Sequence, residues 1–410
     1  MTTNQRIFVI VGAGLAGAKA AEALRERGFD GRVVLIGEES DRPYERPPLS
    51  KGYLTGEAGK DSVFVHDEDF YAAHSVELLT GTAVTALDPA GHTVSLSDGT
   101  TLGFDKALIA TGSQARRLTV PGADLPGVHH LRTKADADAL ATAAATATAA
   151  VVIGAGWIGS EVAASLRSRG LPVTIIEPAS LPLERVLGRE VGLVYRDLHA
   201  GHGVDLRLGD GVAALHGTGR VEEVVTTAGA RIPADLVVAG IGAAPRIQLA
   251  ADAGLTVGDG VVTDEYLRTS HPDIFAAGDI AAAWHPLFRG RLRVEHWANA
   301  LNQGAAAAAG MLGAGEAYAH VPYFFSDQYD LGMEYTGHCP EWDRVVFRGE
   351  PGTDGFLAFW LHDGIVAAAM NANVWDVSDH LQQLVRAQVR VPQERLADPD
   401  VPVEELVKAG

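Results

Sequence analysis

The sequence has almost no cysteine and is short of positive charge. One cysteine, Cys339, stands among 410 residues, so the chain cannot close a disulfide within itself or carry a dithiol redox pair. Such sparse cysteine is typical of a reducing compartment, and we expect a cytoplasmic protein. Lys plus Arg number 33 against 52 Asp plus Glu, which gives a net charge of −19. This charge disfavours nucleic acids and anionic membrane surfaces as partners.

We also expect no targeting, membrane-spanning or metal-binding segment. The first six residues are short and polar, so we expect no signal peptide. Residues 139–160 are uncharged, but they are mostly alanine and threonine before a valine run and a glycine motif, and we interpret them as helix, strand and turn. His199 and His202 fit one helix face but have no third ligand near them, so we expect no metal site. The length predicts two or three globular domains instead.

A strand, a glycine turn and a helix follow one another early in the chain. The apolar run 7–11 leads into the glycine motif 12–17, a helical stretch covers 18–27, and a second strand at 32–36 is followed by Glu38. In this motif the first glycine permits the tight turn, the second lets a pyrophosphate approach the backbone, and the third lets the helix pack closely. An acid after the second strand suits ribose hydroxyls. We expect the turn to bind a dinucleotide through Gly12, Gly14, Ala16 and Gly17.

The same pattern occurs a second time. Residues 151–153 form the apolar run before the glycine motif 154–159, a helix is expected at 160–169, and a strand at 173–176 ends at Glu177. Two such sites in one chain are the arrangement expected when one cofactor passes electrons to the other, the alternative being a purely structural duplication. We expect a flavin and a nicotinamide, the second turn binding through Gly154, Gly156, Ile158 and Gly159.

Two further segments return the chain to the first site. Residues 108–112 form a short strand that ends in the small residues Ala110, Thr111 and Gly112. Residues 274–279 form another apolar strand, and it closes on Asp279, which can meet sugar or ribityl hydroxyls.

Taken together, these motifs resemble the two-dinucleotide-domain flavoprotein reductases, in which the first site holds FAD and an inserted second site holds NAD(P). Within that superfamily, residues 42–51, Arg-Pro-Tyr-Glu-Arg-Pro-Pro-Leu-Ser-Lys, resemble the NADH-dependent ferredoxin reductase branch of the putidaredoxin reductase type, which serves oxygenase systems. The likeness continues at 295–304 and 322–330 and covers about residues 7 to 390. It is strongest in Pro-Pro-Leu-Ser-Lys and Ser-Asp-Gln-Tyr.

The resemblance implies an α/β fold with two Rossmann-like dinucleotide-binding domains and a C-terminal α+β domain. The FAD domain is expected to be discontinuous, at residues 1–112 and 246–322, with the NAD domain inserted at 113–245. Residues 323–410 form the C-terminal domain, which in the family covers the flavin and can support dimers. We therefore expect a monomer or a homodimer.

Roles for individual residues also follow from the resemblance. It places Lys51 near the flavin ring, paired with Glu161, and both are expected to act as catalytic gatekeepers between flavin and nicotinamide. The alternative is that Lys51, Glu161 and Arg46 are all ordinary surface charges. Arg46 is expected at the FAD diphosphate and Trp297 beside the flavin, with Tyr323, Phe324 and Phe325 as further aromatic candidates or plain core. Glu295 is also expected at the FAD site and Gly242 at the NAD site. Arg185, the cation nearest to Glu177 in the sequence, is expected to contact the adenine side of NAD.

Glu177 bears on the choice of nicotinamide. A carboxylate accepts hydrogen bonds from the adenosine ribose hydroxyls but repels a 2′-phosphate. Pro178 and Ala179 follow it, and neither can bind a phosphate by its side chain. The sequence therefore predicts a preference for NADH over NADPH.

Three functions compete. The first is a reductase that passes single electrons from FAD to a [2Fe-2S] ferredoxin, with rubredoxin as the alternative acceptor. The second, a disulfide or peroxide reductase, needs a thiolate beside the flavin, and no cysteine follows Glu38 where one is required. The third is a redox-sensing or scaffold flavoprotein. Acidic ferredoxins need a local cationic patch, for which the alternating Arg289, Arg291 and Arg293 are candidates, unless they form a solvated strand face.

Overall fold

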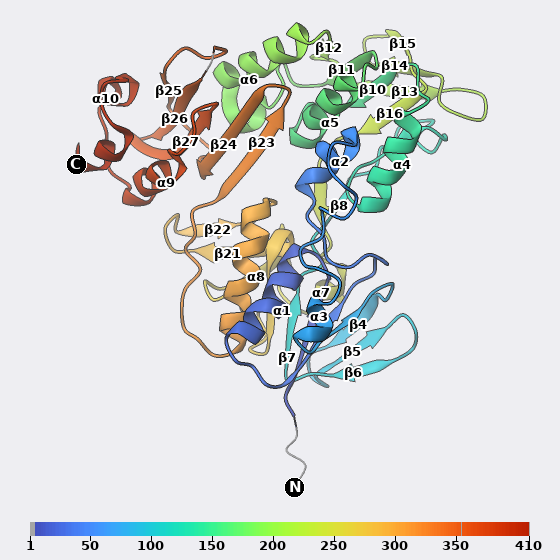
Figure 1. Ribbon diagram of the computed structural model, residues 1–410, viewed down its shortest axis with the longest axis vertical. Coiled ribbons are helices and arrows are strands. Elements are labelled where there is room, and N and C mark those ends of the chain that lie inside the picture. Colours follow the sequence, from blue (N-terminus) through green and yellow to red (C-terminus); the bar gives the residue numbers. More distant parts are fainter. Residues whose placement is uncertain (1–4, 354, 410) are drawn as a thin grey trace. The chain divides into compact units, whose positions relative to one another are not determined.

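The computed structural model describes residues 5–353 and 355–409 and divides them into two compact units (Figure 1). Unit 1 contains the chain up to Glu45, Asp61–Gln114 and Ala244–Pro322. Unit 2 contains Arg46–Lys60, Ala115–Ala243 and the chain from Tyr323 onward. No helix in the described parts of the chain combines the length and the apolar character needed to cross a bilayer.

Unit 1 is built on a parallel sheet of five strands. Along β1 the side chains of Phe8 and Ile10 enter one hydrophobic core and those of Val9 and Val11 enter the other, as the two-residue period of a strand requires. A strand buried on both faces reads as a continuous apolar run, which is what the sequence shows. In spatial order the strands are β20 (Ile274–Ala276), β7 (Lys106–Ile109), β1 (Ile7–Val11), β2 (Arg32–Ile36) and β3 (Val76–Leu79).

Helices cover one face of this sheet and small antiparallel sheets complete the unit. Helix α1 (Leu15–Glu26) packs against α8 (Trp297–Met311), and both contribute alanines to one core. The strands β5 (Thr93–Leu96) and β6 (Thr101–Gly103) form a hairpin, with Gly99 at a φ of +88° in its turn. The remaining elements are α3 (Phe70–Ala73), β4 (Val84–Asp88), β5 (Thr93–Leu96), β6 (Thr101–Gly103), α7 (Gln248–Asp252), β18 (Val257–Gly258), β19 (Gly260–Thr263), η2 (Gly278–Ile280), β21 (Ala281–His285) and β22 (Gly290–Leu292).

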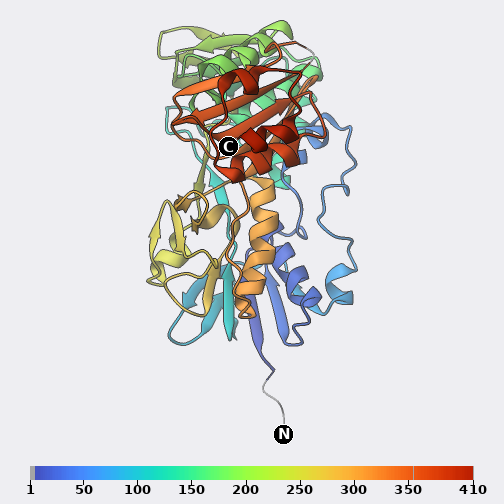
Figure 2. The same cartoon turned by 90° about the vertical axis from the view of Figure 1, so that its left-hand side faces the viewer.

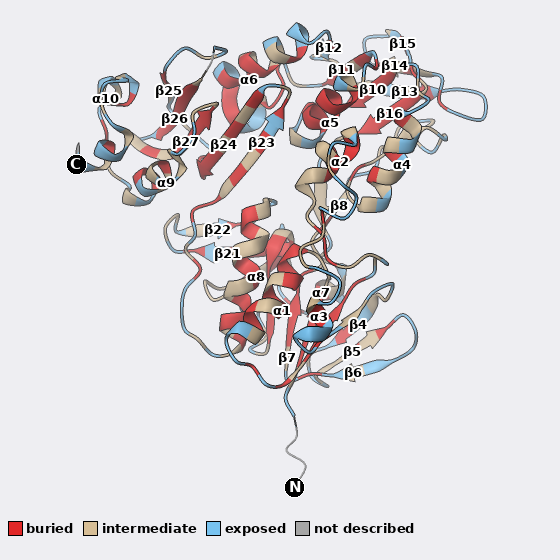
Figure 3. Ribbon diagram, in the orientation of Figure 1, coloured by how far each residue is buried: buried red, intermediate tan, exposed pale blue. Residues whose placement is uncertain are grey.

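Unit 2 repeats the parallel sheet with the same spatial order. Each glycine turn again lies between a central strand and its helix, here β10 and α5 (Trp157–Ser168), and the central strands of both sheets are buried (Figure 3). An antiparallel meander accompanies the sheet, formed by β13 (Val212–His216), β14 (Glu223–Thr226) and β15 (Arg231–Pro233). The parallel strands are β12 (Asp205–Leu208), β11 (Val173–Glu177), β10 (Ala150–Ile153), β16 (Leu236–Ala239) and β9 (Val128–His129).

The C-terminal part of unit 2 is an antiparallel sheet of five strands, which Figure 2 shows side by side. Helix α6 (Glu184–Gly201) belongs to the same core, where the buried Trp360 donates its indole N–H to the carbonyl of Leu187 at 3.1 Å. The α+β character expected from the sequence is therefore present. The elements are β23 (Tyr323–Gln328), β24 (Leu331–Gly337), β25 (Arg344–Arg348), β26 (Phe356–His362), β27 (Ile365–Ala372), α9 (Ser378–Ala387), α10 (Gln393–Ala397) and η3 (Val403–Ala409).

The segment 46–60 packs in unit 2, whereas the sequence grouped it with the first unit. It forms η1 (Pro47–Ser50) and α2 (Gly52–Thr55), and the Tyr53 hydroxyl donates to Asp138 of α4 (Lys134–Ala144) at 2.7 Å. Helix α4 ends at Ala144, before the end of the alanine- and threonine-rich stretch. Alanine favours helix, but Ala150 already belongs to β10, and the sheet overrides the local preference.

The contact between α1 and α8 depends on one glycine. A β-carbon on Gly304 would lie 2.3 Å from the backbone oxygen of Ala16, so Gly304→Ala must push the two helices apart. We expect a loss of about 1–3 kcal/mol in the free energy of unfolding and weaker retention of FAD. Thermal unfolding followed by flavin fluorescence measures both.

Gly201→Ala is the matched control. This helical glycine has no atom within 4 Å of its added β-carbon, so alanine should be neutral or stabilise by up to about 1 kcal/mol. Equal melting temperatures for Gly304→Ala and Gly201→Ala would contradict the predicted contact.

Candidate functional site

The first glycine turn is held by close backbone approaches. Gly12 has a φ of +115°, and a β-carbon there would lie 2.2 Å from the carbonyl oxygen of Ala110. A β-carbon on Gly17 would lie 2.0 Å from the oxygen of Gly12. The turn therefore requires glycine at both positions, and residues 110–112 lie directly beside it, as expected.

The second returning segment also reaches this turn. A β-carbon on Gly278 would lie 3.1 Å from that of Ala16, so the residue just before Asp279 lies against the first turn of α1. The N-cap of α1 is Gly14, which makes no side-chain cap bond and leaves the first amides of the helix for a ligand phosphate. Free helix amides with an acid beside them fit the diphosphate and sugar of FAD.

Other expected FAD residues lie in unit 1 as well. The Ser113 hydroxyl is 3.5 Å from a carboxylate oxygen of Glu295, and Trp297 is the first residue of α8. Their roles toward the flavin stay predictions. Arg46 belongs to unit 2, where its Nε donates to the Arg132 carbonyl at 3.0 Å, and its role at the diphosphate likewise stays a prediction.

Glu38 has a partner that the sequence did not indicate. Arg246 donates to the Glu38 carboxylate at 2.5 Å, and both side chains are exposed. The Arg246 backbone N–H donates to the Gly112 carbonyl at 3.0 Å, and the Arg246 carbonyl accepts from the Thr111 hydroxyl at 3.3 Å. The two residues are 208 positions apart, and only the fold brings them together.

The second glycine turn follows the same construction. A β-carbon on Gly154 would lie 2.5 Å from the oxygen of Gly240, and one on Gly159 would lie 2.0 Å from the oxygen of Gly154. Gly156, by contrast, has open space around the position of a β-carbon and caps α5 without a side-chain bond. That free approach to a helix N-terminus fits the pyrophosphate of a nicotinamide dinucleotide.

The carboxylate of Glu177 is buried and bonded to the turn. The Ala155 amide donates to Oε2 at 2.7 Å, and the Ala179 amide donates to Oε1 at 2.8 Å. Each carboxylate oxygen has a second lone pair, so a ribose hydroxyl is still compatible with this geometry. Glu177 therefore fixes the glycine turn whatever else it binds.

The acids of the two sites do not occupy equivalent positions. Val11 lies opposite Ile36 in unit 1, and Ile153 lies opposite Ile176 in unit 2. Counting from these pairs, Glu177 corresponds to Gly37 and not to Glu38. The first site thus carries an exposed acid one residue further along than the buried acid of the second.

The remaining expected NAD residues are spread around the second turn. Ile158 is 43% exposed in the first turn of α5, and Arg185 is exposed near the beginning of α6. Gly242 follows β16 with a φ of +95°, and its carbonyl accepts the amide of Arg116 at 2.9 Å. Their contacts with a nucleotide stay predictions.

Lys51, which is partly buried, forms an ion pair with the buried Glu161. The Lys51 ammonium lies 2.8 Å from Glu161 Oε2, and the side chains are only 17% and 4% exposed. The Ser50 hydroxyl donates to the same oxygen, and Lys51 also donates to the Pro47 carbonyl at 3.2 Å. The alternative that these are ordinary surface charges is wrong for this pair, because a charge so far from water needs its partners.

The aromatic candidates separate along β23. Phe324 is buried against Trp157 at 4.7 Å between ring centroids, so it belongs to the core of unit 2. Phe325 points the other way, and its ring centroid lies 5.7 Å from the Lys51 nitrogen. The Tyr323 hydroxyl donates to Glu334 at 2.5 Å. Of the three, Phe325 is the one beside the ion pair.

The arginine patch expected at 289–293 is weaker than the sequence indicates. Arg293 is bonded to the carboxylates of Asp259 and Glu295, so two acids offset its charge. Arg291 donates to the Thr263 carbonyl at 2.7 Å but stays exposed, as does Arg289. At most two of the three arginines can contribute charge to a docking surface.

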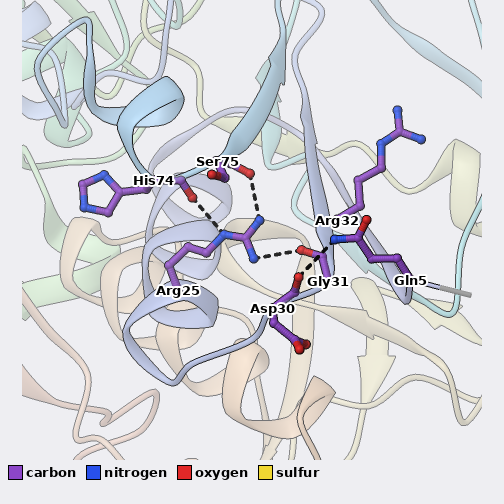
Figure 4. Close-up of a pocket in the computed structure, with 7 residues that line it drawn as sticks. All are labelled: Gln5, Arg25, Asp30, Gly31, Arg32, His74 and Ser75. Carbon is purple, nitrogen blue, oxygen red and sulfur yellow. Dashed lines mark hydrogen bonds between the residues drawn. The ribbon is translucent and has the colours of Figure 1, made fainter. Parts of the chain in front are cut away.

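A surface pocket lies at the opposite end of the unit 1 sheet from the glycine turn. Figure 4 shows Arg25 in this pocket, with its guanidinium donating to the carbonyls of His74, Ser75 and Gly31. Gln5 donates to the Asp30 carbonyl at 3.1 Å. These bonds join the end of α1 to its neighbouring loops, which is a structural role.

Thiol and metal chemistry have no visible site in the described ranges. Cys339 is buried and donates to the Glu341 carbonyl at 3.2 Å, and burial raises the pKa of its thiol to about 11. Across residues 5–353 and 355–409, no three His, Cys, Asp or Glu side chains gather as metal ligands would.

Comparisons with known proteins cover nearly the whole chain. Residues 7–304 match the family model described as pyridine nucleotide-disulphide oxidoreductase, and residues 323–407 match the reductase C-terminal model. The chain is 37% identical to putidaredoxin reductase of Pseudomonas putida, covering 100% of this chain and 98% of that protein. It is 39% identical to the anthranilate 1,2-dioxygenase system ferredoxin–NAD(+) reductase component of Burkholderia cepacia, covering 96% and 97%.

A solved structure agrees with these relatives. The structure of the covalent putidaredoxin reductase–putidaredoxin complex superposes with a TM-score of 0.95 at 37% identity, covering 99% of each chain. A further relative, the ferredoxin–NAD(P)(+) reductase of a Sphingomonas species, is 37% identical over 99% of both chains.

Because Cys339 stays a protonated thiol at working pH, Cys339→Ser should leave NADH-driven reduction of a small dye unchanged. The serine hydroxyl can make the same bond to the Glu341 carbonyl. Stopped-flow flavin reduction and dye assays on matched FAD content measure this. A large loss in the hydride step with FAD intact would show that the thiol takes part.

Proposed function

We propose that this chain, which belongs to the pyridine nucleotide-disulphide oxidoreductase family, is the ferredoxin reductase of an oxygenase system. It binds FAD and NAD and passes electrons from the nicotinamide through the flavin to a [2Fe-2S] ferredoxin. The observation that carries this function is the similarity to such reductases over the whole length, including the C-terminal region. We propose the cytoplasm as its location, in line with the single cysteine.

The competing functions are less well supported. A disulfide reductase needs a thiolate beside the flavin, and the only cysteine of the sequence is a buried, protonated thiol in the C-terminal sheet. A scaffold or sensor flavoprotein would bind the same cofactors without rapid electron donation. Turnover with a protein acceptor separates these two functions.

The chain's own residues bind and orient, and no catalytic triad is needed. FAD, when bound, accepts two electrons as hydride and releases them singly, so it supplies the redox chemistry. The two glycine turns hold the phosphates at the beginnings of α1 and α5. Lys51 holds a positive charge beside α5, and Glu161 of that helix keeps it in place. We propose both as the gatekeeping pair for hydride transfer.

The acceptor is tested with purified proteins. We expect NADH oxidation by the FAD-loaded protein to be coupled to reduction of a [2Fe-2S] ferredoxin, with rubredoxin reduced more slowly. Both acceptors are followed by their own absorbance, and a small dye serves as a control because flavoproteins reduce dyes whatever their partner. Fast dye reduction with no reduction of any ferredoxin tested would favour the sensor function instead.

We also propose that the second dinucleotide site prefers NADH to NADPH. A 2′-phosphate carries about −1.5 to −2 charges at neutral pH and would come close to the buried carboxylate of Glu177. Pro178 and Ala179 offer no cation beside it. Close like charges in a partly buried site cost about 2 kcal/mol or more, which corresponds to selectivity of tens-fold in kcat/KM.

Glu177 variants test this preference. Glu177→Gln removes the charge and keeps one hydrogen-bond acceptor for the turn. It should therefore raise kcat/KM for NADPH, mainly through a lower KM. Glu177→Ala also removes both hydrogen bonds to the turn and should weaken the binding of NADH and of NADPH. Adding Pro178→Arg to Glu177→Gln should raise kcat/KM for NADPH further. A wild-type protein that uses NADPH as well as NADH would show that the carboxylate does not face the ribose.

A further inference from the structure

Glu161 has a second carboxylate oxygen that Lys51 does not reach. Its donor is the Ser326 hydroxyl, at 2.7 Å from Oε1. Ser326 lies on β23, 165 positions from Glu161 in the sequence, and both residues are buried. The C-terminal sheet therefore takes part in holding this carboxylate.

Ser326 is oriented by Gln328, its neighbour on the same face of β23. The Gln328 amide nitrogen donates to the Ser326 oxygen at 3.3 Å. A serine hydroxyl has a single proton, and because its oxygen already accepts from Gln328, that proton is directed to Glu161. The direction of the Gln328 amide thus decides whether Glu161 Oε1 receives a hydrogen bond.

His199 of α6 sets the direction of that amide. Its Nε2 lies 3.0 Å from Gln328 Oε1, and the Tyr329 hydroxyl lies 3.4 Å from Nδ1. An amide oxygen only accepts, so Nε2 carries the proton and Nδ1 accepts from Tyr329. His199 is fully buried, and burial lowers its pKa to about 4, so the ring is neutral at working pH.

Without the His199 donor, the side-chain amide of Gln328 is free to rotate by half a turn, which exchanges the positions of its oxygen and nitrogen. Gln328 Oε1 would then face Ser326 and compete for its only proton. Glu161 Oε1 would lose its donor, and the carboxylate would be less firmly oriented toward Lys51. His199 has no contact with Lys51 itself, so its effect on the ion pair passes through two side chains.

We propose that His199, Gln328 and Ser326 form a positioning chain that orients the Glu161 carboxylate for Lys51 and so sets the rate of hydride transfer. The inference rests on the proposed function, since hydride transfer is the step it affects. All these residues lie in unit 2. None of the three is a catalytic residue, because each acts through Glu161.

The first test uses His199→Leu and His199→Gln. Leucine fills the site without a donor, whereas the amide of glutamine can place an N–H near the former Nε2. In rapid mixing of the FAD-loaded protein with NADH, we expect His199→Leu to slow flavin reduction roughly tenfold with NADH affinity unchanged, the effect of one lost bond to a charged group. His199→Gln should recover most of the rate.

The second test observes Lys51 without turnover. The sequence has six lysines, so carbon-13 labelling gives few side-chain signals, and Lys51→Met assigns the one of interest. We expect the Lys51 signal to shift in His199→Leu and in Ser326→Ala but to stay near its wild-type position in Ser326→Thr, which keeps the hydroxyl. His285→Leu, at a buried histidine of unit 1, is the control and should move neither readout.

The outcomes distinguish a failure of the positioning chain from a failure of the proposed reductase function. A wild-type protein that NADH does not reduce would refute the reductase function, while the Lys51 signal would still report on the chain. Wild-type rates and an unshifted Lys51 signal in His199→Leu and Ser326→Ala would refute the chain and leave His199 a packing residue. If His199→Leu does not fold, the Ser326→Ala and Ser326→Thr pair gives the same decision.

Discussion

The need to compensate one buried carboxylate, that of Glu161, joins three separate segments of unit 2. A charge removed from water is destabilising unless an opposite charge and hydrogen-bond donors surround it. Here the donors come from the segment before α2 and from β23, and both reach α5, 111 and 165 positions away in the sequence. This explains why residues 46–60 pack with the second dinucleotide fold and not with the first.

The two parallel sheets reach one strand order by different routes. In unit 1 the edge strand β20 comes from late in the chain, whereas in unit 2 the edge strand β9 precedes its central strand β10. The requirement they share is a glycine whose backbone touches the neighbouring strand, Gly12 against Ala110 and Gly154 against Gly240. The site therefore depends more on the close approach of the turn glycine to the neighbouring backbone than on the order in which the chain forms the strands.

The electrostatics of the molecule depend on local pairing more than on net charge. The chain carries −19, yet its cations are not freely available to an acidic partner, because several are already paired. Arg293 has two carboxylates, and Arg246 has Glu38. A count of the arginines in residues 289–293 overestimates the charge of that surface, because Asp259, which pairs with Arg293, lies 34 positions earlier in the sequence.

The two glycine turns and the strands and helices around them could be predicted from the sequence, and the family resemblance implied the pairing of Lys51 with Glu161. Glycine requirements and strand periodicity act over a few residues, which is why they can be read locally. The folded chain was needed to see that Glu177 is bonded to its own turn, that Phe324 belongs to the core, and that His199 is linked to Glu161 through β23. Those contacts join side chains distant in sequence, and burial, which no local pattern specifies, determines which partner each polar group must find.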